Sequence, residues 1–267
     1  MIAGKGRYPA ILATRIREHA LQLRLIALEG ESDPALIESF RPEDRVSIKV
    51  GQIGKLIKAL KMFHAHNALM VGQVTPGRLF KGLHPDFRAF LLLKRLKVRN
   101  AASLFGALAA ELHSEGITLL DARAFLDSEM APLGPIVCKH RRIDWDSINY
   151  GLKVAQSLAA CDVGQGLVVR KGTILAMEGF DGTDGMIEYA GRFPPKGKIL
   201  IKLAKPNHDF RFDVPVIGER TIRKLHQFGF SHCIIEAGRV LLLERERVES
   251  IAKDLRISIV GVETGTL

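Results

Sequence analysis

The stretch GLVVRKGTILAMEGFDGTDGMIEYAG, residues 166–191, carries the clearest pattern in the chain. Two short apolar runs, GLVVR (166–170) and GTILAMEG (172–179), meet at Lys171–Gly172, a pair typical of a hairpin turn. A helical pattern over residues 182–191 follows after a short loop. The stretch therefore predicts two adjacent strands and a helix, which are the components of an α/β domain.

Similar runs continue toward the C-terminus. The further strand candidates are KILIKLAK (198–205), FDVPVIG (212–218), CIIEAG (233–238), VLLLE (240–244) and ISIVGV (257–262). Helical patterns interrupt them near residues 146–158, 219–228 and 246–255. The pair Gly238–Arg239 predicts a second hairpin turn. We therefore expect the second half to be an α/β domain with a mixed sheet.

The first half alternates strand and helix patterns more regularly. Its strand candidates are LRLIAL (23–28), ALMVG (68–72) and ITLL (117–120), and a helix is expected to begin at Pro9, a residue favoured in the first turn. Helices between buried strands predict βαβ units and a Rossmann-like parallel sheet. The segment FLDSEMAPLGPIV (125–137) loses this periodicity. We therefore expect a two-domain α/β protein, with an N-terminal Rossmann-like domain over residues 1–130 and a C-terminal α/β domain over residues 131–267.

The composition is that of a globular protein, which excludes a disordered chain. The 267 residues include 39 Lys or Arg and 29 Asp or Glu, a net charge of +10, and 47% are apolar. The three cysteines are odd in number and lack the spacing of a zinc site, which favours a reducing compartment. Because the sequence also has no signal-peptide pattern and no apolar run of about 20 residues, we expect a cytoplasmic protein.

The positive charge is spread over both halves, with one dense patch at residues 78–99. Nucleic-acid-binding proteins usually interleave basic and aromatic residues, and only 6% of this chain is aromatic. We therefore expect no nucleic-acid partner, but an anionic small molecule or a phospholipid surface. Within the patch, DFRAFLLLKRLKV (86–98) predicts a basic amphipathic helix. This helix is expected either to pack Phe87, Phe90 and Leu91 inward or to contact an anionic membrane surface.

Gly4 and Gly6 precede the helix expected at Pro9. A strand, a glycine loop and a helix in this order allow backbone N–H groups and a helix N-terminus to bind a phosphate or diphosphate. The third glycine of the dinucleotide-binding motif is missing, so a plain glycine turn into a helix is the alternative.

Glu178, Asp181 and Asp184 lie close together between a strand and a helix. Mg²⁺ takes one or two carboxylates and completes its coordination with water and phosphate oxygens, so these residues are candidate metal ligands. The alternative is that Asp181 or Thr183 only caps the helix.

The segment KLAKPNHDFRFDVPVIG (202–218) concentrates charged side chains. Lys202 and Lys205 are spaced to neutralise a diphosphate, and a carboxylate at Asp213 could hold a metal ion or orient a water molecule. The alternative is an exposed loop whose charges form ion pairs with one another.

Several of these segments together resemble one known family. The matching stretches are AGKGRYP (3–9), VGQIGKLIKAL (50–60), SLFGALAAELHSEGITLLDA (103–122), DVGQGLVVRKGTILAMEGFDGTDGMI (162–187), ILIKLAKPNHDFRFDVPVIG (199–218) and IIEAGRVLLLERE (234–246). The chain resembles the magnesium-dependent UDP-2,3-diacylglucosamine pyrophosphatases of lipid A biosynthesis, in the two-domain form that is unrelated to the calcineurin-like enzyme.

The resemblance implies hydrolysis of UDP-2,3-diacylglucosamine to lipid X (2,3-diacylglucosamine 1-phosphate) and UMP, with Mg²⁺ as cofactor. It also implies a homodimer, and the lipid substrate suggests peripheral contact with the cytoplasmic face of the inner membrane. Asp213 matches the aspartate that the family needs for catalysis. The residues expected to bind substrate in a cleft between the domains are Gly4, Gly6, Gly72, Gln73, Gln165, Gly166, Thr183, Lys202 and Lys205. Glu178 and Asp184 are the metal ligands that the chemistry of their side chains suggests.

One departure from the family leaves a second hypothesis open. Asn100, Ala101 and Ala102 stand where many members of the family have acidic residues. The alternative function is therefore a non-catalytic protein that binds a sugar nucleotide or an acylated sugar.

Overall fold

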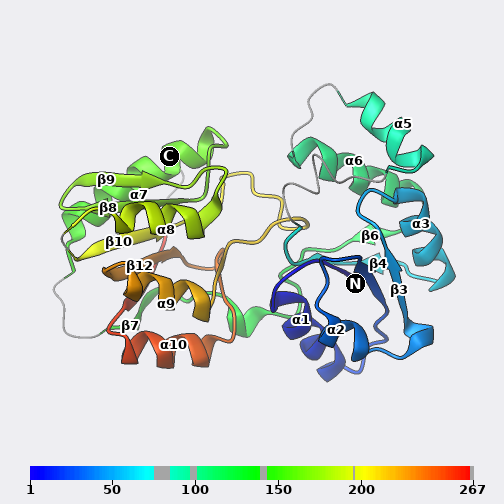
Figure 1. The fold of residues 1–267 in the computed structure, drawn as a ribbon, viewed down its shortest axis with the longest axis horizontal. Coiled ribbons are helices and arrows are strands. Elements are labelled where there is room, and N and C mark those ends of the chain that lie inside the picture. The colour runs from blue at the N-terminus through cyan, green and yellow to red at the C-terminus, as the bar shows by residue number, and fades with distance from the viewer. Residues whose placement is uncertain (75–84, 97–100, 139–142, 195, 265–267) are drawn as a thin grey trace. The chain divides into compact units, whose positions relative to one another are not determined.

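A computed structural model describes residues 1–74, 85–96, 101–138, 143–194 and 196–264 (Figure 1). Two compact units divide the chain: unit 1 contains Met1–Leu126 and Asp209–Asp213, and unit 2 contains Asp127–His208 and Val214–Leu267. The first stretch of unit 1 ends at Leu126, slightly before the boundary expected after residue 130. Unit 1 also includes residues 209–213, which lie far along the chain from the rest of it. Each unit is described by itself below, and the cleft expected between the domains stays a prediction.

Unit 1 contains a parallel sheet with the strand order β3-β2-β1-β5. Its strands are β1 (Ile2–Ala3), β2 (Leu25–Leu28), β3 (Arg45–Ile48) and β5 (Met70–Val71). All three neighbouring pairs are parallel. A second, two-stranded parallel pair joins β4 (Asn67–Ala68) to β6 (Thr118–Leu119). The prediction of a Rossmann-like parallel sheet is confirmed.

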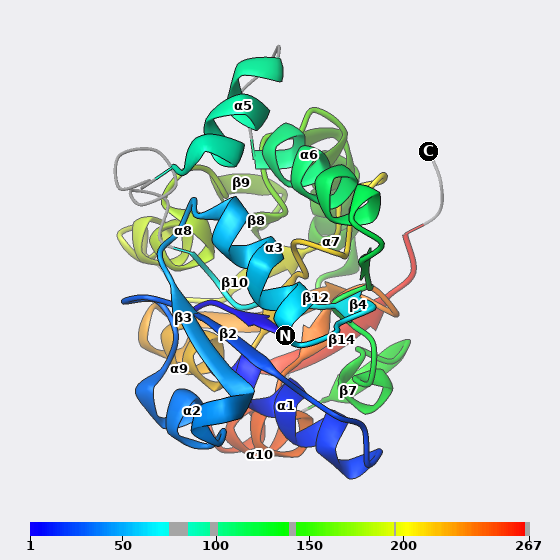
Figure 2. The same cartoon turned by 90° about the vertical axis from the view of Figure 1, so that its right-hand side faces the viewer.

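The helices of unit 1 are α1 (Tyr8–Glu18), α2 (Pro34–Glu38), α3 (Ile53–Met62), α5 (Phe87–Arg95) and α6 (Ala101–Ser114), with a short 3-10 turn at Pro42–Asp44. Pro9 lies in the first turn of α1, as predicted. Leu60 of α3 and Leu112 of α6 pack in one core with Ile2 and Ile26 of the sheet. Figure 2 shows α1 and α2 on the opposite side of this sheet from α3 and α6.

Unit 2 contains a mixed six-stranded sheet with the order β7-β14-β12-β10-β8-β9. These strands are β7 (Gly134–Val137), β8 (Gly166–Arg170), β9 (Thr173–Met177), β10 (Lys198–Lys202), β12 (Phe230–Glu236) and β14 (Ser258–Val262). β10, β12 and β14 are parallel, whereas β7 and β8 are antiparallel to their neighbours. The predicted mixed sheet is therefore confirmed.

One of the two predicted hairpin turns is correct. Lys171 and Gly172 have φ values of 46° and 71° and join the antiparallel strands β8 and β9. The prediction at Gly238–Arg239 is wrong. The strand that follows, β13 (Leu241–Leu242), pairs in parallel with β11 (Val216–Ile217), while β12 is already paired on both edges by β10 and β14.

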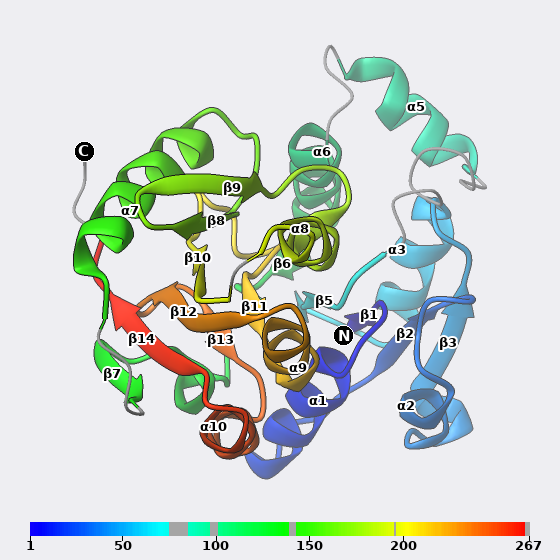
Figure 3. The same ribbon diagram turned by 60° about the vertical axis from the view of Figure 1, so that its left-hand side comes forward.

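Helices cover both faces of the unit 2 sheet. The helices are α7 (Trp145–Ala160), α8 (Gly182–Gly191), α9 (Glu219–Gln227) and α10 (Arg245–Asp254), and a 3-10 turn lies at Asp127–Glu129. α7 packs Ile148 and Ala155 on one face, and α8, α9 and α10 pack on the other (Figure 3). Every residue of β10 and β12 is buried because both faces of these central strands are covered.

The helix expected over residues 86–98 is present as α5. The expectation that it packs Phe87, Phe90 and Leu91 inward is wrong, because all three are exposed, and its buried residues are Ala89 and Leu92. Within the part of the chain that the structure describes, no helix combines the length and apolar character needed to cross a membrane.

Candidate functional site

In unit 1, the loop after β1 and the end of β5 approach each other very closely. The Gly4 N–H donates to the Val71 carbonyl at 2.8 Å, and the Lys5 N–H donates to the Gln73 carbonyl at 2.7 Å. A Cβ on Gly4 would lie 2.4 Å from the Gln73 carbonyl oxygen, and one on Gly72 would lie 2.7 Å from the Lys5 carbonyl oxygen. Gly72 also has a φ of +89°, which other residues rarely adopt. The fold thus brings Gly4, Gly72 and Gln73 together and requires glycine at two of these positions.

This contact lies where the order of the strands changes direction. The chain proceeds from β1 to β2 on one side, and the strand on the other side of β1 is the later β5. Open α/β sheets bind ligands at the carboxyl ends of their strands at such a point. Gly6, with a φ of +95°, turns the chain here into α1, whose first N–H groups suit an anion. The position therefore supports phosphate binding by the glycine loop.

Asp213 belongs to the same unit as the glycine loop. The Ala122 N–H donates to the Phe210 carbonyl at 2.9 Å, and the Phe212 ring stacks on the Phe105 ring with centroids 5.4 Å apart. These contacts attach residues 209–213 to unit 1. Asp213 follows them directly and is exposed, so its carboxylate is accessible to a ligand.

In unit 2, three of the predicted residues form one polar cluster that is largely buried at Lys202 and partly buried at the other two. The Lys202 ammonium lies 3.1 Å from Oε2 and 3.3 Å from Oε1 of Glu178. The Thr183 hydroxyl donates to Glu178 Oε1 at 2.9 Å and accepts a hydrogen bond from Lys202. The side chain of Lys202 is 7% exposed and that of Glu178 is 15% exposed. This cluster of Glu178, Thr183 and Lys202 is called the Lys202 cluster below.

The strand directions explain why these residues meet. Lys202 ends β10, Glu178 follows the end of β9, and Gly166 begins β8, which is antiparallel to both strands. A Cβ on Gly166 would lie 2.6 Å from Glu178 Oε2, so glycine leaves room for the carboxylate. The carbonyl of the preceding Gln165 accepts a hydrogen bond from the Leu203 N–H at 2.8 Å. Gln165 and Gly166 are thus placed beside the Lys202 cluster.

The remaining predicted residues have other partners. Lys205 forms an ion pair with Asp162. Asp184 lies 2.6 Å from Nη2 of Arg220 and 3.2 Å from Nζ of Lys224, both on α9. Glu178 and Asp184 therefore belong to separate ion-paired groups. Asp181, the alternative helix cap, makes no capping hydrogen bond with its side chain.

The nearby thiol of Cys233 is fully buried. Burial raises the pKa of this thiol to about 12, although the positive charge of Lys202 opposes the rise. The polar groups at this end of β10 are therefore those of the Lys202 cluster, and the Cys233 thiol is not one of them.

The carboxylates do not form a complete metal site of their own. In the described ranges, no group of three or more His, Cys, Asp or Glu side chains could hold a metal ion. Mg²⁺ commonly takes only one or two protein carboxylates and relies on water and substrate phosphates for the rest. In the described ranges, Glu178 and Asp184 could supply at most that small share of the ligands, and only if both gave up their present ion pairs.

Glu236 was missed in the sequence. It ends β12 and is almost fully buried, and its Oε2 accepts a hydrogen bond from the Ala204 N–H at 2.7 Å. Nη2 of Arg239 donates to the Lys205 carbonyl at 2.5 Å. These two side chains hold the backbone that carries Lys205. The signal was present, because Glu236 is a carboxylate at the end of the apolar run CIIEAG.

The described arrangement can be compared with known proteins. The LpxI N-terminal domain matches residues 1–128, and the LpxI C-terminal domain matches residues 135–260. A protein of Caulobacter vibrioides named UDP-2,3-diacylglucosamine pyrophosphatase LpxI is 29% identical over 279 residues, which cover 98% of this chain and 96% of that protein. Asp213, the glycine loop and the Lys202 cluster all lie inside the matched domains. The chain, matched in both domains and in their order, belongs to the LpxI family.

Proposed function

We propose that this protein hydrolyses the diphosphate bond of UDP-2,3-diacylglucosamine to lipid X and UMP in lipid A biosynthesis. The observation that carries the proposal is the relative from C. vibrioides, whose name states this pyrophosphatase activity and which aligns with 98% of the chain. The matches to both LpxI domains support it, because they include every residue proposed for the site.

The side chains offer the functions that hydrolysis of a diphosphate requires. The glycine loop of unit 1 presents backbone N–H groups at the start of α1, which suit a phosphate. Lys202 is a cation held by Glu178 and Thr183, and its ammonium group could bind phosphate oxygens once Glu178 contacts the metal ion instead. We propose that the exposed carboxylate of Asp213 orients the attacking water or contacts the metal ion.

We propose Mg²⁺ as the cofactor, with Glu178 and Asp184 as its carboxylate ligands. Glu178 would exchange its contact with Lys202 for the metal ion, and Asp184 would exchange its contacts with Arg220 and Lys224. When bound, the ion would neutralise the diphosphate and polarise the bond that breaks. Lys202, released from Glu178, would then be available to phosphate oxygens.

The decisive experiment is incubation of the purified protein with UDP-2,3-diacylglucosamine, either with Mg²⁺ or with a chelator. We expect lipid X and UMP, identified by mass spectrometry, only when Mg²⁺ is present. Asp213→Asn should lower turnover by about 100-fold or more, because general acid–base groups contribute on this order. Asp209→Asn, in the same segment, serves as the matched control and should retain turnover.

The outcomes separate the two hypotheses. Saturable binding of the UDP-sugar without any metal-dependent turnover would support the non-catalytic alternative. Turnover of Asp213→Asn at the wild-type rate would remove Asp213 from the catalytic role. Hydrolysis in ¹⁸O-labelled water, followed by mass analysis of both products, would show which phosphorus is attacked.

We further propose a cytoplasmic homodimer with peripheral contact to the inner membrane. The family resemblance supports the dimer, and the lipid portion of the substrate supports the membrane contact. Sedimentation equilibrium would measure the mass of the assembly, and a monomer at all concentrations would contradict the dimer.

A further inference from the structure

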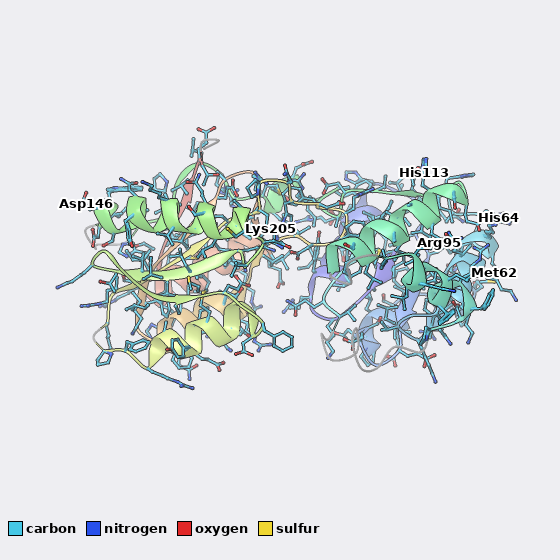
Figure 4. The ribbon with its side chains drawn as sticks, turned by 90° about the horizontal axis from the view of Figure 1, so that it is seen from above. Met62, His64, Arg95, His113, Asp146 and Lys205 are labelled. Atoms are coloured by element: carbon cyan, nitrogen blue, oxygen red, sulfur yellow. The ribbon has the colours of Figure 1, made fainter. Side chains whose placement is uncertain are left out.

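The outer face of α5 in unit 1 is apolar over its first turns and basic at its end. Phe87 is 75% exposed and Phe90 is 57% exposed, and Leu91 is exposed beside them. With Lys94 these residues have the spacing i, i+3, i+4 and i+7, so they lie on one side of the helix. Lys94 and Arg95 form the basic last turn, and Figure 4 labels Arg95 there. Phe87, Phe90, Leu91, Lys94 and Arg95 are called the α5 face below.

Contacts on the other side of α5 hold the helix in this orientation. The Asp86 carboxylate accepts hydrogen bonds from the Ala89 N–H at 3.0 Å and from the Gly54 N–H of α3 at 2.6 Å. The Arg88 guanidinium donates to Glu115, which follows α6, at 2.5 Å. Ala89 and Leu92 are buried. The exposure of the α5 face therefore follows from a helix that is fixed on α3 and α6 within its own unit.

The charged side chains of the α5 face are basic, and the acidic side chains of Glu111 and Glu115 near α5 pair with Arg88. Asp86 is the only acidic residue over 85–96, and its carboxylate is bound to the starts of α3 and α5. Lys94 and Arg95 are exposed and form no ion pair with any other residue that the structure describes. The adjacent helix α3 adds the exposed side chains of Lys55 and Lys58. Apolar side chains beside unpaired cations complement an anionic lipid surface.

We propose that the α5 face docks the protein on an anionic lipid bilayer. Phe87, Phe90 and Leu91 enter the boundary between headgroups and acyl chains, and Lys94 and Arg95 contact lipid phosphates. A second copy of the chain fits less well, because a symmetric contact through this face would bring the same cations of both copies together. The inference rests on the membrane contact proposed above and names the surface that makes it; because binding to a bilayer requires no turnover, it can fail while the hydrolase activity stands.

The test is co-sedimentation of the full chain with vesicles in the absence of substrate. We expect binding to vesicles of equal parts phosphatidylglycerol and phosphatidylcholine and weak binding to phosphatidylcholine alone. The double variant Phe87→Ser, Phe90→Ser should lower the partition coefficient on the mixed vesicles by about tenfold or more. Trp145→Ser with Tyr150→Ser removes two exposed aromatic side chains from α7 in unit 2, and this matched control should bind like the wild type.

A second variant separates charge from apolar contact. Lys94→Glu with Arg95→Glu should weaken binding to the mixed vesicles and leave binding to phosphatidylcholine unchanged. Circular dichroism would verify that each variant keeps the wild-type unfolding transition. Equal binding of the wild type and the Phe87, Phe90 variant would overturn the proposal. The proposal would also be overturned if the wild type did not bind the mixed vesicles. A Phe87, Phe90 variant that dissociates an oligomer but binds vesicles normally would overturn it too.

Discussion

Lys202 is the residue on which the polar cluster of unit 2 depends. Its side chain is almost completely buried, so removal of its ammonium group from water is costly unless its charge is compensated. Glu178 supplies the opposite charge and Thr183 supplies a further hydrogen bond. The cluster places a cation at the carboxyl end of the interior strand β10, and this arrangement becomes unfavourable when either partner is lost.

Lys202→Met should therefore destabilise unit 2. The variant leaves the Glu178 carboxylate buried without its partner, and we expect the free energy of unfolding to fall by about 3 kcal/mol. Adding Glu178→Leu should recover most of this loss, because no buried charge then remains. Urea denaturation followed by circular dichroism measures both values. Equal stability of the single and double variants would contradict this account of the pair.

Asp86 links two helices rather than capping one. Its Oδ1 accepts from the Ala89 N–H of α5, and its Oδ2 accepts from the Gly54 N–H in the first turn of α3. The first N–H groups of a helix lack partners within the helix, so a single carboxylate here satisfies donors of both. This arrangement fixes the orientation of α5 and, with it, the exposure of Phe87 and Phe90.

Asp86→Ala should loosen α3 and α5 together. We expect the stability of unit 1 to fall by about 1–2 kcal/mol, because caps contribute about 1 kcal/mol each. Amide hydrogen exchange should become faster at both Gly54 and Ala89. Asp33→Ala is the control, since the Asp33 side chain caps the short helix α2 by accepting from the Ala35 N–H and does not link it to another helix in the described structure. Faster exchange at Ala89 alone would show that Asp86 serves only its own helix.

The path of the chain connects the two units in an unusual way. The chain leaves unit 2 after His208, contributes residues 209–213 to unit 1 and returns to unit 2 at Val214. Phe212 packs beside the core of unit 1, and the guanidinium carbon of Arg123 lies 3.5 Å from the centroid of the Phe210 ring. The position of Asp213 therefore depends on the folding of unit 1, although the chain before residue 209 and after residue 213 belongs to unit 2.

Phe212→Ala should therefore destabilise unit 1 and leave unit 2 unaffected. The half-buried ring loses its stacking on Phe105, and we expect a loss of about 2 kcal/mol. Hydrogen exchange measured by mass spectrometry should become faster in α6 and remain unchanged in β12. Faster exchange in β12 with no change in α6 would contradict the assignment of this segment to unit 1.

Local patterns were sufficient for most of the secondary structure. The run GLVVR is the strand β8 over the residues expected, and the helical pattern over 182–191 is α8. The patterns failed where the backbone deviates from regular periodicity. β7 contains Pro135 and lies at the sheet edge, so the sequence resembled a loop, and only Val216–Ile217 of the expected strand 212–218 pairs with another strand.

The contacts of the Lys202 cluster were not predictable from the sequence, although its residues were named there. Glu178 and Lys202 were singled out from local chemistry, and Thr183 as a possible helix cap and through the family resemblance. Their mutual hydrogen bonds depend on β8 running antiparallel to β9 and β10. Asn100, on which the alternative function depends, lies outside the described residues, as do Arg78, Lys81, Lys97 and Arg99 of the basic patch. The side chains of Ala101 and Ala102 are likewise not described.

The order of residues along the chain was enough to predict two α/β domains and family membership, because periodicity, turn residues and ordered motifs are local properties. The partner of each charge was not predictable in this way. Lys202 meets Glu178 across two strands, Gly4 meets Gln73 across the end of a sheet, and the aromatic side of α5 faces outward. Each of these depends on strand pairing and helix packing between distant residues, where the burial of apolar surface selects one arrangement among many with the same local pattern.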